Sequence, residues 1–232
     1  MVEVVERYGA GFINFYDDNF TLKKSRVAEI CELILERGLK VDWKCEGRVD
    51  GVDPPLLRLM RRAGCRAIAY GVESGNPETL SLLRKDVTLD ETRRAFAETR
   101  AAGLASVAYI ILGAPGEDRD AVGRTLDFCR EIQATYVQFS TLTAFPGTPL
   151  FDGAARGGEM KSVKNPVDGD LNRLTLTDLS SSELDRLMRR AWLDFYLRPT
   201  PLLRLGRDAV RSGSLDEAWR LGRALGRWAR AA

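Results

Sequence analysis

The clearest pattern in the chain is the apolar run Val107–Leu112, which breaks abruptly into the loop Gly113–Glu117. The run is almost continuously apolar, and residues with helical spacing follow the loop. A strand that is apolar on both faces is usually covered by helices on both sides, as in parallel sheets. Ligand sites of α/β proteins lie in the loops that follow such strands. The run therefore predicts a parallel sheet with candidate chemistry at its carboxyl end.

Similar runs recur along the first two thirds of the chain and predict strands that start near residues 12, 41, 67, 107 and 136. Between them, apolar side chains recur with the spacing of one helical face, for example at Val27, Ile30, Cys31, Ile34 and Leu35. Strands and helices that alternate every 25 to 40 residues indicate parallel βα units with right-handed crossovers. We expect an α/β fold, as an open doubly wound sheet or as part of a barrel.

Capping motifs mark the starts of two predicted helices. Thr88 with Glu91, and Ser180 with Glu183, have the spacing of a capping box, in which each side chain bonds the other's backbone N–H. Pro199 breaks the helix that begins after Ser180.

Composition shifts suggest three parts: a core at residues 1–150, a connecting segment at 151–179 and a helical extension at 180–232. The connecting segment is rich in Gly, Pro and polar residues, which is typical of a mobile linker. The extension contains two basic stretches that predict helices, at residues 202–211 and 215–232.

Composition and charge are those of an ordinary globular protein. The chain has 232 residues, of which 44% are hydrophobic and 29% charged. No apolar stretch approaches the roughly 20 residues of a membrane span, and no signal-peptide pattern opens the chain, so we expect a cytoplasmic protein. The net charge is +2, but from residue 198 onward eight Arg face three acidic residues, giving +5 there and −3 before it. The basic C-terminal helix could contact a membrane surface or could be a solvated or packed face; no nucleic-acid partner is expected.

The chain has four cysteines and no histidine. Cys31, Cys45, Cys65 and Cys129 are separated by 14, 20 and 64 positions, which is not the spacing of a metal site. Their apolar or helical surroundings predict buried thiols. The absence of histidine excludes Ser-His and Cys-His catalysis and histidine-bearing zinc sites. We assign no metal ligand and no catalytic residue from the sequence.

Polar residues and glycines gather directly after the predicted strands. They are Asp17, Asp18, Asn19, Glu46, Arg48, Glu73, Ser74, Asn76, Gly113, Pro115, Gly116 and Glu117. Because carboxyl ends of parallel strands share one edge, we expect these residues to line one crevice. A carboxylate beside a hydroxyl or an amide suits a ribose diol, and glycine-flanked backbone suits an adenine edge.

Each group also has a structural alternative. The residues Asp17–Asn19 could cap the following helix, and Arg48 could pair with a nearby surface carboxylate. The stretches Glu73–Pro77 and Gly113–Glu117 could be simple turns. An unrelated barrel enzyme with a phosphate loop is disfavoured, because no Lys, Ser or Thr lies beside the glycines of the last loop.

Five motifs in this order resemble the radical S-adenosylmethionine family: Tyr16–Phe20, Arg48–Asp50, Gly71–Asn76, Leu112–Glu117 and Phe145–Pro149. The similarity spans residues 8–205 and is closest to the branch with an N-terminal cobalamin-binding domain. Phe195–Pro199 also resembles the tail of that branch. It implies a partial parallel (β/α) barrel with about five of six strands and a methyltransferase-like activity.

The resemblance also implies which residues bind the cofactor S-adenosylmethionine. Asp17 and Asp18, with Asn19 beside them, match positions near the methionyl amine, and Arg48 points toward the pocket. The positions near the ribose and the adenine are Glu73, Ser74, Asn76, Gly113, Pro115, Gly116 and Glu117.

The chain departs severely from the family, because this sequence lacks the first barrel strand, the cluster loop and the upstream cobalamin-binding domain. Family members carry a CxxxCxxC motif whose thiolates ligate a [4Fe-4S] cluster, and this chain has none. Val2–Tyr8 resembles the helix just after that motif, and the cobalamin domain is not in this sequence, so cobalamin is implied only for a longer form. We expect a core that binds S-adenosylmethionine but is incomplete for radical catalysis, with an open sheet edge for a missing N-terminal domain or companion chain. Alternatives are a cluster-less nucleoside- or partner-binding module and one piece of a split enzyme.

Overall fold

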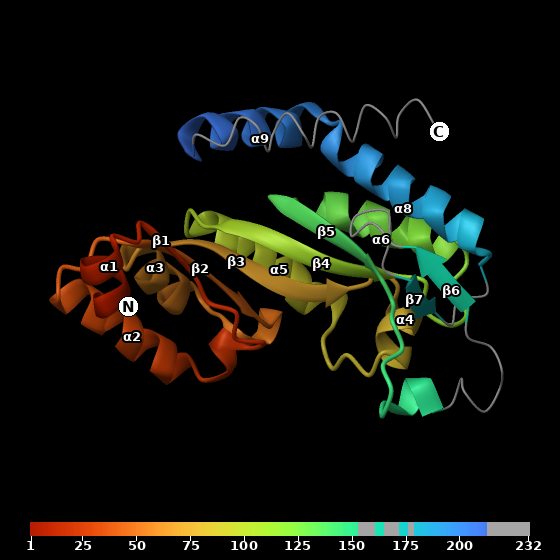
Figure 1. Ribbon diagram of the computed structural model, residues 1–232, viewed down its shortest axis with the longest axis horizontal. Helices are drawn as coiled ribbons and strands as arrows, with labels where there is room; N and C mark the ends of the chain where they lie inside the picture. The colour runs from red at the N-terminus through yellow and green to blue at the C-terminus, as the bar shows by residue number, and fades with distance from the viewer. Residues whose placement is uncertain (153–160, 165–171, 176–178, 213–232) are drawn as a thin grey trace. The chain divides into compact units, whose positions relative to one another are not determined.

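The computed structural model describes residues 1–152, 161–164, 172–175 and 179–212 (Figure 1). The chain divides into two compact units, each of which is treated by itself. Unit 1 comprises Met1–Glu73, Leu80–Tyr109 and Phe128–Gln138. Unit 2 comprises Ser74–Thr79, Ile110–Asp127 and Phe139–Ala232.

The main sheet has five parallel strands in the order of the chain, β1-β2-β3-β4-β5 (Figure 1). Their bounds are Phe12–Asn14, Asp42–Gly47, Cys65–Glu73, Ala105–Leu112 and Tyr136–Thr141. All five lie where the apolar runs predict strands, and the sequential order is that of βα units with parallel neighbours. The α/β class and the partial parallel barrel are confirmed. Among the described strands β1 is an edge, because it pairs only with β2.

Helices follow the strands as expected. Their bounds are α1 Val2–Tyr8, α2 Lys24–Glu36, α3 Pro54–Arg62, α4 Pro77–Leu82, α5 Leu89–Ala101, α6 Arg119–Glu131, α8 Ser181–Tyr196 and α9 Pro199–Ser212. Short 3-10 turns lie at Phe20–Leu22 (η1) and Val49–Gly51 (η2). Both predicted capping boxes are confirmed, at the start of α5 and at the start of α8. α4 was not predicted; its first residue, Pro77, is the last residue of the stretch that could have been a simple turn.

The core of unit 1 forms around the indole of Trp43 on β2. Its Nε1 donates a hydrogen bond to the carbonyl of Ala63 at 2.8 Å, so the buried polar group is satisfied. Phe15 and Phe20 pack against the indole with ring centroids 5.7 and 5.8 Å away. This cluster fixes the loop between β1 and α2 against the sheet.

A two-stranded antiparallel sheet was not predicted. β6 (Lys161–Lys164) pairs with β7 (Asn172–Thr175) inside the stretch that was expected to be only a connection. Each of these strands contains a single apolar residue, Val163 or Leu174, so neither shows the alternation that indicates a strand. The predicted basic stretch 202–211 lies within α9, and 215–232 lies outside the described residues.

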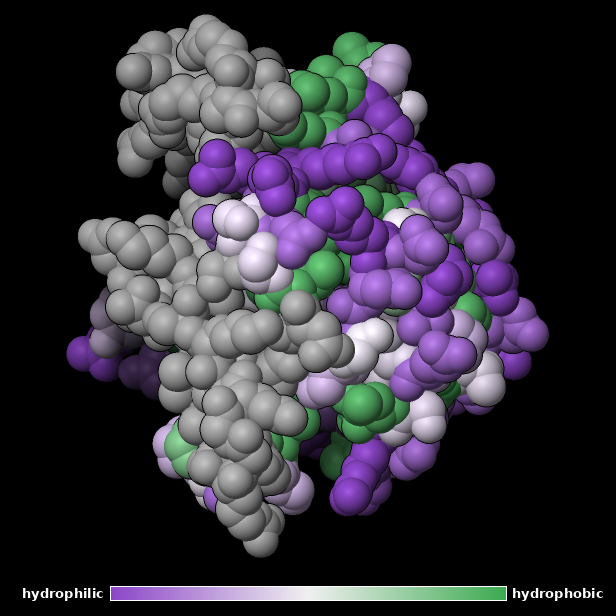
Figure 2. All heavy atoms as spheres, turned by 90° about the vertical axis from the view of Figure 1, so that its right-hand side faces the viewer, coloured by the Kyte–Doolittle hydropathy of each residue, from purple (hydrophilic) through white to green (hydrophobic). Residues whose placement is uncertain are grey.

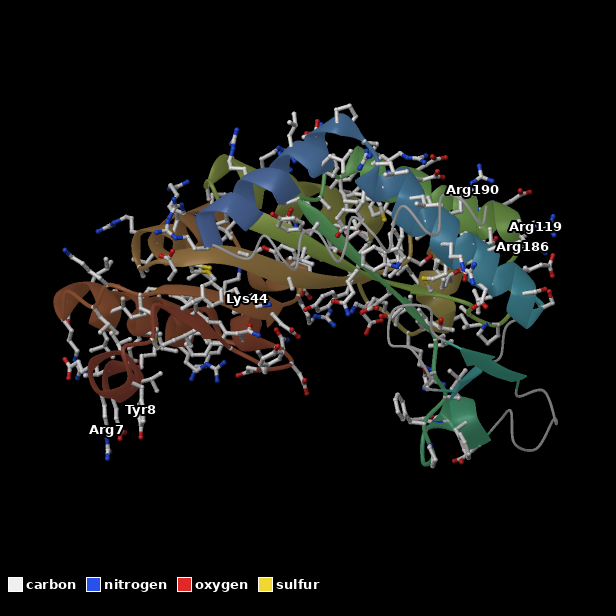
Figure 3. All side chains as sticks on the ribbon, turned by 45° about the horizontal axis from the view of Figure 1, so that its top comes forward. Arg7, Tyr8, Lys44, Arg119, Arg186 and Arg190 are labelled. Carbon is white, nitrogen blue, oxygen red and sulfur yellow. The ribbon has the colours of Figure 1, made fainter. Side chains whose placement is uncertain are left out.

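On the face shown in Figure 2, hydrophilic side chains outnumber hydrophobic ones among the coloured residues. Figure 3 shows Arg7 and Tyr8 projecting from α1, a helix that buries none of its residues. Across the described ranges we find no helix with the length and apolar character that a membrane crossing needs.

Candidate functional site

The loop after β1 carries the first predicted group, in unit 1. Asp17 is exposed; its Oδ1 accepts a hydrogen bond from the backbone N–H of Asn19 at 3.1 Å, and its Oδ2 pairs with Arg26 at 3.2 Å. Asp18 is exposed as well. The N-cap of α2 is Lys23, so none of the three residues caps that helix; Asn19 is the N-cap residue of the short 3-10 turn η1, without a side-chain cap bond. Their contact with a cofactor stays a prediction.

Arg48, after β2, is fixed by a carboxylate and a buried threonine. Its guanidinium bonds both oxygens of Asp50, with Nε–Oδ1 at 3.0 Å and Nη2–Oδ2 at 2.9 Å. The hydrogen bond raises the pKa of Arg48 and lowers that of Asp50. The Arg48 N–H donates to Thr21 Oγ1 at 3.3 Å, and a Cβ on Gly51 would lie 2.5 Å from that oxygen. The ion pair between Arg48 and Asp50 is the pairing with a nearby carboxylate that the sequence left open as an alternative.

Glu46, on β2, is hydrogen-bonded to a residue from a more distant strand. Tyr109 on β4 donates its hydroxyl to Glu46 Oε1 at 2.8 Å. Ala69 on β3 stands beside Glu46 in the strand register, and its small side chain lets the two reach each other. Burial and this hydrogen bond raise the pKa of Tyr109. The sequence did not connect the two residues, although strand alternation places both on one face.

Glu73 ends β3 in a left-handed conformation, with φ at +66°. Its Oε1 lies 2.8 Å from Lys85 Nζ, and both side chains are about four-fifths buried, with 18% and 20% exposed. A Cβ on Gly71 would lie 2.5 Å from Glu73 Oε1 and 2.9 Å from Lys85 Nζ, so glycine leaves room for the pair. Such backbone strain in a non-glycine residue persists only where the surroundings hold it. Lys85 was missed, because nothing in the local sequence marks it.

In unit 2, Ser74 and Asn76 belong to a buried hydrogen-bond network around Thr125 of α6. Ser74 Oγ lies 2.9 Å from Thr125 Oγ1 and accepts the N–H of Asn76 at 3.1 Å. Thr125 Oγ1 also accepts the Gly75 N–H at 3.1 Å, and the Asn76 side chain donates to Thr79 at 3.0 Å. The network fixes the turn that follows β3. A contact between these side chains and a ribose stays a prediction.

The loop after β4, also in unit 2, is held by its own acidic residue. Glu117 is only 2% exposed, and its Oε2 accepts the N–H of Gly113 at 2.6 Å and of Ala114 at 3.3 Å. Gly113 and Gly116 have φ of +87° and +70°, which glycine adopts at little cost. Burial raises the pKa of Glu117, against the effect of the two backbone donors. Within the described residues, Glu117 Oε1 is buried with no hydrogen-bond partner.

The loop therefore leaves part of its surface open. Pro115 is half-buried and Gly116 exposed, while Glu117 faces inward. The sequence presented Glu117 as an acceptor for a ligand; its visible role is to accept the loop's own N–H groups.

The four cysteines are all buried, as predicted. Burial raises the pKa of the Cys31 thiol to about 12 and that of Cys65 well above its usual value. Iron–sulfur clusters are held by several thiolates gathered at one place. Nowhere in the described part of the chain do three or more Cys, Asp or Glu side chains gather as a metal site. These residues do not fit a [4Fe-4S] cluster.

Comparison with known sequences identifies related proteins. Residues 1–129 match the Radical SAM superfamily. The chain is 30% identical over 204 residues to an uncharacterized methyltransferase of Pyrococcus horikoshii, covering 85% of this chain and 43% of that protein. It is 31% identical over 153 residues to the anaerobic magnesium-protoporphyrin IX monomethyl ester cyclase of Cereibacter sphaeroides, covering 64% of this chain and 25% of that one. The chain thus spans less than half the length of these relatives.

Solved structures share the fold. The radical S-adenosylmethionine methyltransferase TsrM from Kitasatospora setae, with cobalamin and a [4Fe-4S] cluster bound, matches with a TM-score of 0.63 at 22% identity, over 69% of this chain and 32% of that one. The cobalamin-dependent S-adenosylmethionine radical enzyme OxsB matches with a TM-score of 0.64 at 17% identity, over 84% and 36%. Since the family match covers more than half of its residues, the chain belongs to the radical S-adenosylmethionine superfamily, among methyltransferase-like relatives.

Proposed function

We propose that this chain is the S-adenosylmethionine-binding core of a methyltransferase-like radical enzyme, and that it binds this cofactor without assembling an iron–sulfur cluster on its own cysteines. The observation that carries the proposal is the loop Gly113–Glu117. The Glu117 carboxylate satisfies two of its backbone donors, so the loop keeps one conformation before any ligand arrives. A preformed loop with an exposed glycine suits the flat face of a nucleobase, because little conformational entropy is lost on binding.

The carboxylate of Glu73 supports the same proposal from unit 1. A carboxylate accepts hydrogen bonds from both hydroxyls of a ribose diol, and the ion pair with Lys85 at 2.8 Å orients this carboxylate. The strained backbone at Glu73 is a cost that a ligand-binding role would explain.

The cluster and the cobalamin belong, on this proposal, to parts of the enzyme beyond these 232 residues. Within the described residues the cysteines form no metal-binding group, so cluster ligands would come from a further segment or from a companion chain. The open edge of β1 is a place where such a segment could pair.

Calorimetric titration with S-adenosylmethionine and with S-adenosylhomocysteine tests the binding half of the proposal. We expect heat of binding in wild type, at least about tenfold weaker binding in Glu73→Ala, and wild-type binding in the control Glu78→Ala, which removes an exposed carboxylate from α4. Absence of binding in the wild type, or equal binding in the Glu73 variant, would overturn it.

Anaerobic reconstitution with iron and sulfide tests the second half. The chain alone should hold no [4Fe-4S] absorption, whereas a version extended by an upstream segment with a CxxxCxxC motif should hold one cluster. A stoichiometric cluster on the chain alone would contradict the proposal. If the extended version binds no cluster but still binds the nucleoside, the buried cysteines favour the second candidate, a nucleoside-binding module without radical chemistry.

A further inference from the structure

A cleft opens in unit 1 at the amino-terminal ends of the strands, where β1, β2 and β3 begin. It has a volume of about 510 Å³ and lies where α2 turns into β2 and α3 turns into β3. In Figure 1 this edge is at the left, at the tails of the strand arrows. The residues predicted for S-adenosylmethionine follow the opposite ends of the strands, so the cleft is a different place on the fold.

The floor of the cleft is apolar. Ile34 and Leu35 from the last turn of α2 line it together with Leu39 and Val41. Leu35 is 36% exposed, an apolar side chain left open to solvent. A smaller apolar hollow of about 160 Å³ shares Ile34 and Leu39 and extends toward α1. A volume of several hundred Å³ is enough for a small organic molecule with an apolar body.

The rim is cationic. Lys40 and Arg62 line the cleft, and neither makes an ion pair within the part of the chain that the structure describes. Arg66 is paired with Asp42 at 2.7 Å. The lining therefore carries three positive charges and one negative. The carbonyl ends of α2 and α3 add about half a negative charge each, which leaves a net charge of about +1.

The walls are set by backbone geometry. Gly38, with φ at +60°, ends the turn after α2, and Gly64, with φ at +93°, packs so closely that a Cβ would overlap the carbonyl of Val41. The Gly64 carbonyl accepts the N–H of Trp43 at 3.1 Å, and the Asp42 N–H donates to Gly11 at 3.2 Å. Because these bonds form with the fold, a ligand would meet a preformed cleft.

We propose that this cleft binds a small amphipathic anion, with one carboxylate or phosphate head group on an apolar body. The head group meets Lys40 and Arg62, and the body covers Ile34, Leu35 and Leu39. Apolar burial alone would accept any hydrophobic molecule, and the charge alone would accept any anion. Their adjacency selects molecules that have both. The proposal does not depend on the binding of S-adenosylmethionine.

Octyl phosphate, kept below its critical micelle concentration, is the probe. Calorimetry should detect binding to wild type, with octyltrimethylammonium and inorganic phosphate each binding about tenfold more weakly or not at all. The double variant Lys40→Gln/Arg62→Gln and the variant Leu35→Gln should each bind octyl phosphate about tenfold more weakly. Arg94→Gln, which removes an exposed charge from α5, should bind like wild type.

Thermal melting by circular dichroism shows whether the variants fold; if the double variant does not, the single variants Lys40→Gln and Arg62→Gln carry the test. Equal binding of the cationic probe, or unchanged binding in the rim variants, would overturn the proposal. Unchanged binding in the rim variants would mean that Lys40 and Arg62 only neutralise the partial negative charge at the carbonyl ends of α2 and α3. Binding to vesicles that contain anionic lipid, without binding of the monomeric probe, would also overturn it, because the surface would then recognise a membrane.

Discussion

Glu117 and Gly113 close the loop after β4 on itself: the Glu117 Oε2 accepts the Gly113 backbone N–H at 2.6 Å. The carboxylate is almost fully buried, and its other oxygen has no partner within the described residues. Burying a carboxylate is costly unless its hydrogen bonds compensate. The position of this side chain therefore controls the shape of the loop that we assign to the adenine side of the cofactor.

Replacing Glu117 by alanine should release the loop. Two backbone N–H groups lose their acceptor, so the free energy of unfolding should fall by about 1–3 kcal/mol, and S-adenosylmethionine affinity should fall as well. Urea denaturation and calorimetry measure the two effects. Asp120→Ala, which removes an exposed carboxylate from the next helix, should change stability by less than about 0.5 kcal/mol.

The same carboxyl should make stability depend on pH. Burial raises its pKa above 4.5, so the folded protein retains a proton that the unfolded chain has already released. The stability that this group contributes is full below the unfolded pKa and is lost as pH rises through the folded pKa. The melting temperature of wild type relative to Glu117→Gln should therefore fall between pH 4 and pH 7. A constant difference across that range would contradict a raised pKa.

Glu73→Gly should show how much of the effect of losing Glu73 is strain relief. Glycine relieves the left-handed strain, worth about 1–3 kcal/mol, while the lost ion pair leaves the largely buried Lys85 without its partner, which costs up to about 3–5 kcal/mol. We expect a smaller loss of unfolding free energy than in Glu73→Ala, together with about tenfold weaker S-adenosylmethionine binding. Wild-type affinity in this variant would remove Glu73 from the cofactor site.

Gly71→Ala should disturb the Glu73–Lys85 pair without unfolding the protein. The new methyl group would lie 2.5 Å from Glu73 Oε1 and 2.9 Å from Lys85 Nζ, both at the ends of flexible side chains that can move away. Cofactor affinity should fall several-fold, while the far-UV circular dichroism spectrum stays unchanged. Gly123→Ala on α6 is the matched control, because its Cβ meets nothing within 4 Å; it should bind normally and gain about 0.5–1 kcal/mol in stability.

The cysteines should be unreactive in the folded protein. Cys31, Cys45, Cys65 and Cys129 are each at most 1% exposed, and the pKa of Cys31 is raised to about 12. Titration with a thiol-reactive chromogenic disulfide should find no rapidly reacting thiol under native conditions and all four in guanidinium chloride. A fast native thiol would mean that one of these positions opens, and would reopen the question of a metal ligand.

Local features of the sequence predicted local structure well. The apolar runs located all five main strands, and the capping boxes at Thr88 and Ser180 located two helix starts. Such signals lie within three or four residues, a distance over which backbone hydrogen bonding decides conformation. The hairpin of β6 and β7 was missed, because its pairing joins two short segments whose pattern is weak.

The partners of the candidate site residues were beyond the reach of sequence patterns. Glu73 contacts Lys85, which is 12 positions away in the sequence. Ser74 contacts Thr125, 51 positions away, and Glu46 contacts Tyr109, 63 positions away. Each contact depends on strand order, register and the seating of a helix, and none of these is encoded in a local motif. The sequence alone determined the strands, their alternation with helices and the family. The tertiary structure decided which polar side chains are exposed and which, like Glu117, are buried and hold a loop, because burial and pairing arise only when distant segments pack together.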